Sequence, residues 1–127
     1  MDKISDRLFL GNLQAAQNFE ALKQNNITHI LTVADTIRPF FPRDFTYKVI
    51  LVRDKPDTNL LRHLPAAIQF IREGVRSGGV LVHCVAGVSR SATCVIAYLM
   101  QEEEMSFPMA FAKASQKRPV IFPNVGF

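Results

Sequence analysis

The spacing of hydrophobic and polar residues predicts strands that alternate with helices along the chain. Runs rich in β-branched and apolar residues predict four strands, at 3–10, 27–33, 45–52 and 80–84. Stretches with apolar residues at helical spacing, or apolar almost all round, predict three helices, at 13–24, 60–75 and 91–100. A last helix is predicted at 108–116, where Pro108 suits the first turn. This order predicts an α/β fold with a central, largely parallel sheet flanked by helices.

Two neighbouring elements are expected at the centre of the domain. The run 80–84 is short, apolar and bounded by glycines, as expected of a central strand that is covered on both faces. The helix 91–100, apolar almost all round, is expected to be buried. By contrast, the opening run 3–10 suits an edge strand. Ligands of α/β folds lie at the carboxyl ends of the strands, and Cys84 is placed at such an end.

The composition is that of one globular domain. The chain has 127 residues, so residues 1–127 are expected to form a single domain. Hydrophobic residues make up 48% and charged residues 20%, which is enough to bury a core. Its apolar stretches are far shorter than the roughly 20 residues of a bilayer span, and the N-terminus has no secretory hydrophobic region. We therefore expect a protein of the cytoplasm, or of the nucleus as well, that does not bind membranes.

The formal net charge of +4 favours anionic partners in general without choosing among them. Small basic groups are more simply solvated surface, and they occur at Arg53 and Lys55, at Arg72 and Arg76, and at Lys117 and Arg118.

Two cysteines, Cys84 and Cys94, do not predict a disulfide, because both fall within one continuous strand–loop–helix unit. Free thiols suit a reducing compartment. Cys94 lies on the buried helix and is expected to pack in the core. His29 and His63 are more simply surface or core residues than partners of a cysteine-protease nucleophile. No ligand cluster has the spacing of a zinc site, and we expect neither a metal nor another cofactor.

The segment from His83 to Ser91, His-Cys-Val-Ala-Gly-Val-Ser-Arg-Ser, joins the central strand to the buried helix. Consecutive backbone N–H groups can curl into a nest around a phosphate, and they belong to Val85, Ala86, Gly87, Val88, Ser89 and Arg90. Gly87 permits a backbone conformation or a close approach that a side chain would block. The N-terminus of the helix and the planar guanidinium of Arg90 direct positive charge to the same place. The loop is therefore expected to bind a phosphate dianion.

The same environment acts on Cys84. A free thiol has a pKa of about 8.5, and converging amides, a helix N-terminus and a cationic neighbour lower it by stabilising the thiolate. Cys84 is therefore expected to attack phosphorus in line and give a thiophosphoryl-enzyme that water hydrolyses. Ser91 can hydrogen-bond the departing thiolate in the second step. His83 is expected to orient the loop through backbone contacts, without acting as a base.

An alkoxide or phenoxide leaving group needs a proton, so a general acid is expected on a separate loop. The segment 53–57 follows a predicted strand and lies upstream of the loop that carries Cys84. Asp54 is the preferred candidate and Asp57 the reserve. The same carboxylate could later deprotonate the hydrolytic water.

These residues resemble the dual-specificity protein phosphatases of the Cys-x5-Arg protein tyrosine phosphatase superfamily, whose signature is His-Cys-x-x-Gly-x-x-Arg-Ser. The likeness covers nearly the whole chain, at 8–11, 91–93, 95–100, 105–107, 110–111, 118–119 and 123–127. It implies a protein tyrosine phosphatase-like fold, Asp54 as the general acid and Asn124 as a support of the phosphate loop. Because no kinase-docking domain is present, the chain resembles the small, atypical, single-domain members.

The loop's variable positions favour a singly phosphorylated side chain as substrate. Relatives that act on phosphoinositides or RNA 5′ phosphates often place lysines there, whereas Val85, Ala86 and Val88 are apolar. The resemblance implies a phosphatase for phosphotyrosine and phosphoserine or phosphothreonine in proteins, a monomer whose partner is a phosphoprotein and not nucleic acid. Two alternatives stay open: a phosphatase for a phosphoinositide, RNA 5′ phosphate or glycan phosphate, and a non-catalytic module that binds phosphoproteins.

Overall fold

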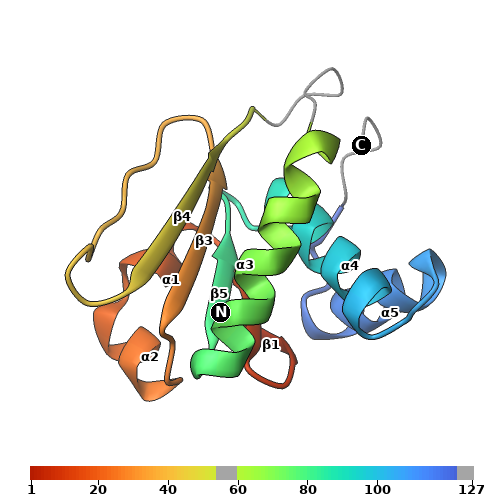
Figure 1. Cartoon of the computed structure of the whole chain (residues 1–127), viewed down its shortest axis with the longest axis horizontal. Coiled ribbons are helices and arrows are strands. Elements are labelled where there is room, and N and C mark those ends of the chain that lie inside the picture. Colours follow the sequence, from red (N-terminus) through yellow and green to blue (C-terminus); the bar gives the residue numbers. More distant parts are fainter. Residues whose placement is uncertain (54–59, 123–127) are drawn as a thin grey trace.

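The computed structural model describes residues 1–53 and 60–122, and within them the strands form one five-stranded sheet (Figure 1). In chain order the strands are β1 (Asp2–Ser5), β2 (Leu8–Gly11), β3 (His29–Ala34), β4 (Thr46–Leu51) and β5 (Val80–His83). Across the sheet their order is β1-β2-β5-β3-β4, with β1 antiparallel to β2 and the other pairs parallel. The expected largely parallel sheet is confirmed, and β5, which precedes Cys84, is its middle strand.

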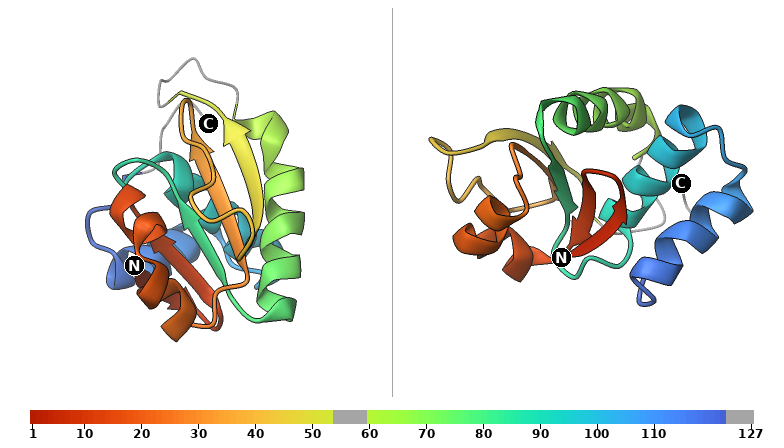
Figure 2. Two further views of the ribbon diagram at one scale, coloured as in Figure 1. Left: turned by 90° about the vertical axis from the view of Figure 1, so that its left-hand side faces the viewer. Right: turned by 90° about the horizontal axis from the view of Figure 1, so that it is seen from below.

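Helices cover both faces of this sheet (Figure 2). In chain order they are α1 (Leu13–Gln17), α2 (Phe19–Gln24), the 3-10 turn η1 (Leu61–His63), α3 (Leu64–Ser77), α4 (Arg90–Glu102) and α5 (Phe107–Lys117). The short helices α1 and α2 lie on one face, whereas α3, α4 and α5 lie on the other. Within the described ranges, no helix combines the length and the hydrophobicity needed to cross a membrane.

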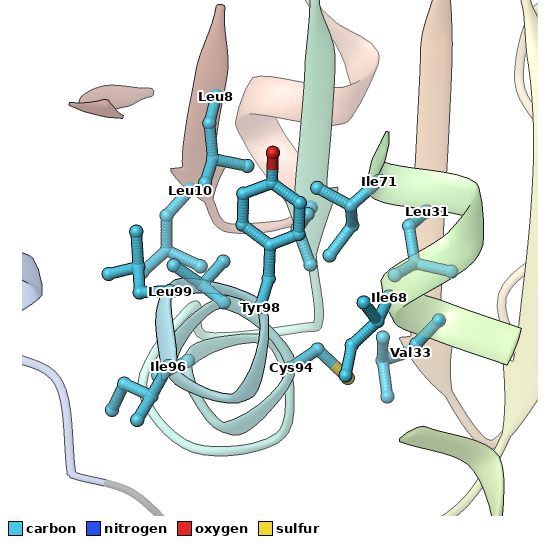
Figure 3. Packing of buried hydrophobic residues seen from close by; sticks show 14 of the residues in the cluster. Leu8, Leu10, Leu31, Val33, Ile68, Ile71, Cys94, Ile96, Tyr98 and Leu99 are labelled. Atoms are coloured by element: carbon cyan, nitrogen blue, oxygen red, sulfur yellow. The ribbon is translucent and has the colours of Figure 1, made fainter. Parts of the chain in front are cut away.

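The alternation of side chains along the strands divides the core into two clusters. Phe9 of β2 belongs to the smaller cluster, under α1 and α2, whereas its neighbours Leu8 and Leu10 belong to the larger one. Figure 3 shows Leu99 and Cys94 of α4 among the side chains that fill this larger cluster. Because α4 has buried residues all along its length, the predicted burial of the helix 91–100 is confirmed.

Two predicted elements are divided where a local backbone feature interrupts them. The run 3–10 forms the hairpin β1–β2, whose turn includes Arg7 at a positive φ of 62°. Its first strand lies at the sheet edge, as predicted, but its second lies inside the sheet. The stretch 13–24 forms two helices, because the side chain of Asn18 accepts a hydrogen bond from the Ala21 N–H at 3.1 Å and caps α2. Asparagine favours such caps over helix interiors.

Candidate active site

The loop that follows β5 joins the middle of the sheet to the first turn of α4. Cys84 is the first residue after β5 and Arg90 is the first residue of α4, and both are buried. Between them, Gly87 has a φ of 70°. A Cβ atom at this position would lie 2.6 Å from the carbonyl oxygen of Gly11, at the end of the neighbouring strand β2. The backbone angle and the close approach both require glycine, as the sequence predicted.

The carbonyl groups of this loop are hydrogen-bonded on its outer side by distant segments. The backbone N–H of Leu13 donates to the carbonyl of Val85 at 2.9 Å, and the backbone N–H of Phe122 donates to the carbonyl of Val88 at 2.7 Å. In a trans peptide unit the carbonyl and the following N–H point in opposite directions. These bonds therefore direct the N–H groups of Ala86 and Ser89, which share peptide units with these carbonyls, toward the inner side of the loop.

A charged side chain holds the part of the loop between these two contacts. The guanidinium of Arg118, which follows α5 directly, donates to the carbonyl of Gly87 at 2.7 Å and to that of Ala86 at 3.2 Å. Its Nη1 also pairs with the carboxylate of Asp2 in β1 at 2.8 Å. The expectation that Arg118 belongs to a solvated basic surface is wrong, because its side chain is only 15% exposed and is bonded to the loop.

The thiol of Cys84 lies on the inner side of the loop. Its sulfur is 3.0 Å from the hydroxyl oxygen of Ser91. Burial by itself favours the neutral thiol, but hydrogen bonds from the Ser91 hydroxyl and from the backbone N–H groups of Ser91, Gly87 and Val88 outweigh it. The pKa of Cys84 is therefore lowered from its ordinary value of 9.0. This direction agrees with the expectation from the sequence.

The guanidinium of Arg90 lies at the carboxyl ends of β3 and β4. Its Nη1 donates to the carbonyl of Val52 at 3.0 Å and lies 3.6 Å from a carboxylate oxygen of Asp35. Its Nε is buried and has no hydrogen-bond partner among the described residues. A buried N–H without a partner costs about 1–3 kcal/mol. Such a donor suits a charged acceptor that enters from outside, such as a phosphate oxygen.

His83 supports the loop from behind. Its Nδ1 lies 3.2 Å from the carbonyl oxygen of Cys84, which can only accept, so Nδ1 carries the proton. Its Nε2 then accepts from the hydroxyl of Thr32 at 2.9 Å. Burial lowers the pKa of His83, which keeps the ring neutral. The contact of His83 with the backbone carbonyl of Cys84 is the one expected from the sequence. The hydrogen bond with Thr32 was not predicted, because Thr32 comes to lie beside His83 only through the pairing of β3 with β5.

The other candidate residues of the sequence fall into two groups. Cys94 is fully buried in the larger core cluster, and burial raises the pKa of its thiol to about 12, so its predicted packing role is confirmed. Asp54, Asp57 and Asn124 lie outside the described residues. The assignment of the general acid and the support from Asn124 therefore stay predictions.

The fold and the loop together define a class of protein. An α/β domain whose middle parallel strand leads into a loop with an activated cysteine at its start and a buried arginine at its end has the arrangement of a cysteine-dependent phosphatase domain. Residues 8–127 match the family model described as "Dual specificity phosphatase, catalytic domain". The chain belongs to this family.

Individual relatives resemble nearly the whole of the chain. It is 50% identical to Dual specificity protein phosphatase 1 of Arabidopsis thaliana, over 98% of this chain and 63% of that protein. It is 45% identical to Dual specificity protein phosphatase 19 of Mus musculus, over 94% of this chain and 55% of that protein. The chain thus spans less than two thirds of the length of these two relatives.

Solved structures of other proteins superpose closely on this fold. Human DUSP28 superposes with a TM-score of 0.95 at 31% identity, and this covers 99% of this chain and 89% of that one. The human tyrosine phosphatase-like serine/threonine/tyrosine-interacting protein superposes with a TM-score of 0.94 at 38% identity, with the same coverage of 99% and 89%. The predicted protein tyrosine phosphatase-like fold is confirmed.

Proposed function

We propose that this domain hydrolyses phosphate monoesters on tyrosine and on serine or threonine side chains of proteins, through a cysteinyl-phosphate intermediate. One observation carries the proposal: the activated thiol of Cys84 lies among inward-facing N–H groups, in the loop that ends at the unpaired Nε of Arg90. The same loop thus offers a nucleophile and a binding site for the anionic group that it attacks.

The first step transfers the phosphoryl group to sulfur. The loop N–H groups and the guanidinium of Arg90 hold the phosphate oxygens and stabilise the charge that spreads over them. The thiolate of Cys84 attacks phosphorus in line with the ester oxygen, so that an S–P bond forms as the P–O bond breaks. The carboxylic acid of Asp54, with Asp57 as the reserve, gives its proton to the leaving oxygen.

The second step returns the enzyme to its starting state. A water molecule attacks phosphorus and gives a proton to the carboxylate that acted as acid. The S–P bond breaks, its electron pair returns to the sulfur of Cys84, and orthophosphate leaves. The hydroxyl of Ser91, 3.0 Å from that sulfur, donates a hydrogen bond to the thiolate as it departs.

The loop supports a singly phosphorylated side chain as the substrate. Val85 is 42% exposed and Ala86 is also exposed, and both are apolar, so neither brings positive charge to a second phosphate. A polyphosphorylated head group would gain strongly from such charge in a partly buried site. The names of the curated relatives, which are protein phosphatases, support a phosphorylated protein as the partner.

The first test is the hydrolysis of p-nitrophenyl phosphate in the presence of a chelator. We expect Cys84→Ser to abolish turnover, whereas Cys94→Ala keeps it, because Cys94 is buried in the core and its raised pKa keeps its thiol neutral. Equal turnover by the wild type and Cys84→Ser would contradict the proposal. Loss of turnover in chelator would contradict a mechanism that uses only side chains, amides and water.

A substrate panel then decides the chemical class. We expect phosphotyrosine and phosphoserine or phosphothreonine peptides to be hydrolysed faster than a phosphoinositide, a 5′-phosphorylated RNA or a phosphorylated glycan. The reverse order would favour the phosphatase for a non-protein substrate. Folded wild type that binds phosphopeptides without turnover would instead be a binding module. One similar structure carries the name of a phosphatase-like interacting protein.

We further propose that the protein acts as a monomer in the cytoplasm, or in the nucleus as well. The support for the compartment is chemical: the mechanism needs Cys84 reduced, and both cysteines of the chain are free thiols. Imaging of a fluorescent fusion and size-exclusion chromatography test the two parts. Secretion of the fusion, or elution as a stable dimer, would contradict them.

A further inference from the structure

Arg118 contacts the outer side of the loop through two of its three nitrogens and β1 through the third. Its Nε donates to the carbonyl of Gly87 at 2.7 Å, its Nη2 donates to the carbonyl of Ala86 at 3.2 Å, and its Nη1 pairs with Asp2 at 2.8 Å. The carboxylate of Asp2 therefore holds the guanidinium in the orientation that the two carbonyls need. These contacts join segments that are more than thirty positions apart in the sequence.

The two carbonyls belong to the peptide units that serve the nucleophile. The carbonyl of Ala86 shares a planar peptide unit with the N–H of Gly87, and the carbonyl of Gly87 shares one with the N–H of Val88. Those two N–H groups are the ones that donate to the sulfur of Cys84 from within the loop. Because each unit is trans, a carbonyl fixed on the outer side directs its N–H inward.

The loop needs such a restraint at this point. Gly87 carries no Cβ and adopts a φ of 70°, so steric hindrance from a side chain does not limit rotation of the peptide units on either side of it. An ideal Cβ on Gly87 would lie 2.6 Å from Nη2 of Arg118, which shows how closely the guanidinium covers these units. Without Arg118, the carbonyls of Ala86 and Gly87 would lose these donors and could turn toward the thiolate.

We propose that Arg118, oriented by Asp2, is a positioning residue that sets the ionisation of Cys84 and the affinity of the loop for phosphate. It acts through the peptide units 86–87 and 87–88 and touches neither sulfur nor substrate. The consequence for turnover rests on the proposed function. The consequences for the thiol and for phosphate binding do not require turnover.

The test compares Arg118→Ala, Arg118→Lys and Asp2→Asn with the wild type. Lysine keeps the positive charge but lacks the planar guanidinium, which can bond two carbonyls and a carboxylate at the same time. Asp2→Asn leaves the guanidinium and removes its counter-charge. Arg72→Ala is the matched control, because Arg72 also pairs with a carboxylate at 2.7 Å, that of Glu102. Glu102 is at the far end of α4, about 18 Å from Arg90 by helical rise.

Two measurements report on the thiol and on the loop without catalysis. The rate of Cys84 alkylation by iodoacetamide as a function of pH gives its pKa, and mass spectrometry separates it from Cys94. Titration with inorganic phosphate gives the affinity of the loop for phosphate. For Arg118→Ala we expect the pKa of Cys84 to rise by about one unit and phosphate affinity to fall about tenfold. Turnover of p-nitrophenyl phosphate should fall about tenfold to a hundredfold, which is less than the hundredfold to thousandfold cost of removing an oxyanion donor, because the N–H groups are displaced and not removed.

The conservative variants and a rescue separate positioning from folding. Arg118→Lys and Asp2→Asn should shift both quantities in the same direction by less, and low, non-denaturing guanidinium should partly restore Arg118→Ala. Arg72→Ala should match the wild type. If Arg118→Ala does not fold, as judged by thermal melting, the other two variants decide the question.

The proposal is wrong if folded Arg118 variants keep the thiol pKa and phosphate affinity of the wild type. It is also wrong if Arg72→Ala shifts both quantities equally. A wild type that shows no turnover would overturn the proposed function. If its Cys84 pKa still differs from that of the Arg118 variants, the role of Arg118 in positioning the loop stands.

Discussion

The hydroxyl oxygen of Ser91 lies 3.0 Å from the sulfur of Cys84, seven positions earlier in the chain. Ser91 is in the first turn of α4 and is fully buried, so the helix fixes its position. Its backbone N–H also donates to the same sulfur. Ser91 therefore offers two donors to the thiolate, and a mutation can remove one of them without changing the backbone.

We expect Ser91→Ala to slow hydrolysis of the cysteinyl-phosphate more than its formation. A hydrogen bond to a charged group is worth about 1.5–3 kcal/mol, so turnover should fall about tenfold to a hundredfold. Rapid-quench kinetics should show a burst of aryl product followed by a slow steady state. Ser115→Ala, which removes an exposed hydroxyl on α5, is the control. A variant without a burst, or with the turnover of the wild type, would contradict the role of Ser91.

Gly87→Ala should abolish phosphate binding. The left-handed φ of 70° costs a side chain about 1–2 kcal/mol, and the new Cβ would also lie 2.6 Å from the carbonyl oxygen of Gly11. The loop must therefore shift and lose its inward N–H groups. Titration with inorganic phosphate measures the loss, and thermal melting should show that the rest of the domain stays folded. Wild-type affinity in the variant would mean that the loop tolerates another backbone.

Stability at alkaline pH should depend on Cys94. Burial raises the pKa of its thiol from 9.0 to about 12, so the folded state favours the neutral form. This contribution is complete below pH 9 and is lost as the pH rises from 9 toward 12, because the unfolded chain releases its proton first. The wild type should unfold with a larger free energy than Cys94→Ala at neutral pH. This difference in the free energy of unfolding should shrink above pH 9, by up to about 1.4 kcal/mol per pH unit. Urea unfolding at a series of pH values measures the difference, and a constant difference would count against the prediction.

Asp54→Asn should slow the hydrolysis of phosphates whose leaving groups need a proton. General acid catalysis contributes about a hundredfold to ten-thousandfold, so alkyl phosphates should lose that much rate and p-nitrophenyl phosphate far less. A series of aryl and alkyl phosphates gives the dependence of rate on leaving-group pKa. Asp57→Asn is the matched variant, and a steeper dependence in Asp57→Asn alone would move the assignment to that residue.

The helices and strands were predictable where a pattern of neighbouring residues defines them. Hydrophobic periodicity predicted α3, a nearly continuous apolar stretch predicted α4, and Pro108 as a first-turn residue predicted α5. The glycine-bounded apolar run predicted β5 as a central strand. Two predicted elements were divided by single residues. Asn18 caps α2 and ends the preceding helix, and Arg7 lies in the turn that makes a hairpin of the first strand. The spacing of apolar residues is judged over many positions, so it does not show where a single residue ends a helix or a strand.

The sequence by itself determined which residues the loop brings together, because Cys84, Gly87, Arg90 and Ser91 lie in one short strand–loop–helix connection. Only the tertiary structure decided what holds that connection in shape. Asp2 and Arg118 are 116 positions apart, and they meet beside the loop because β1 and α5 lie close together in the fold. A hydrogen bond between such distant segments leaves no periodic pattern along the chain, since its partners are chosen by packing and not by spacing.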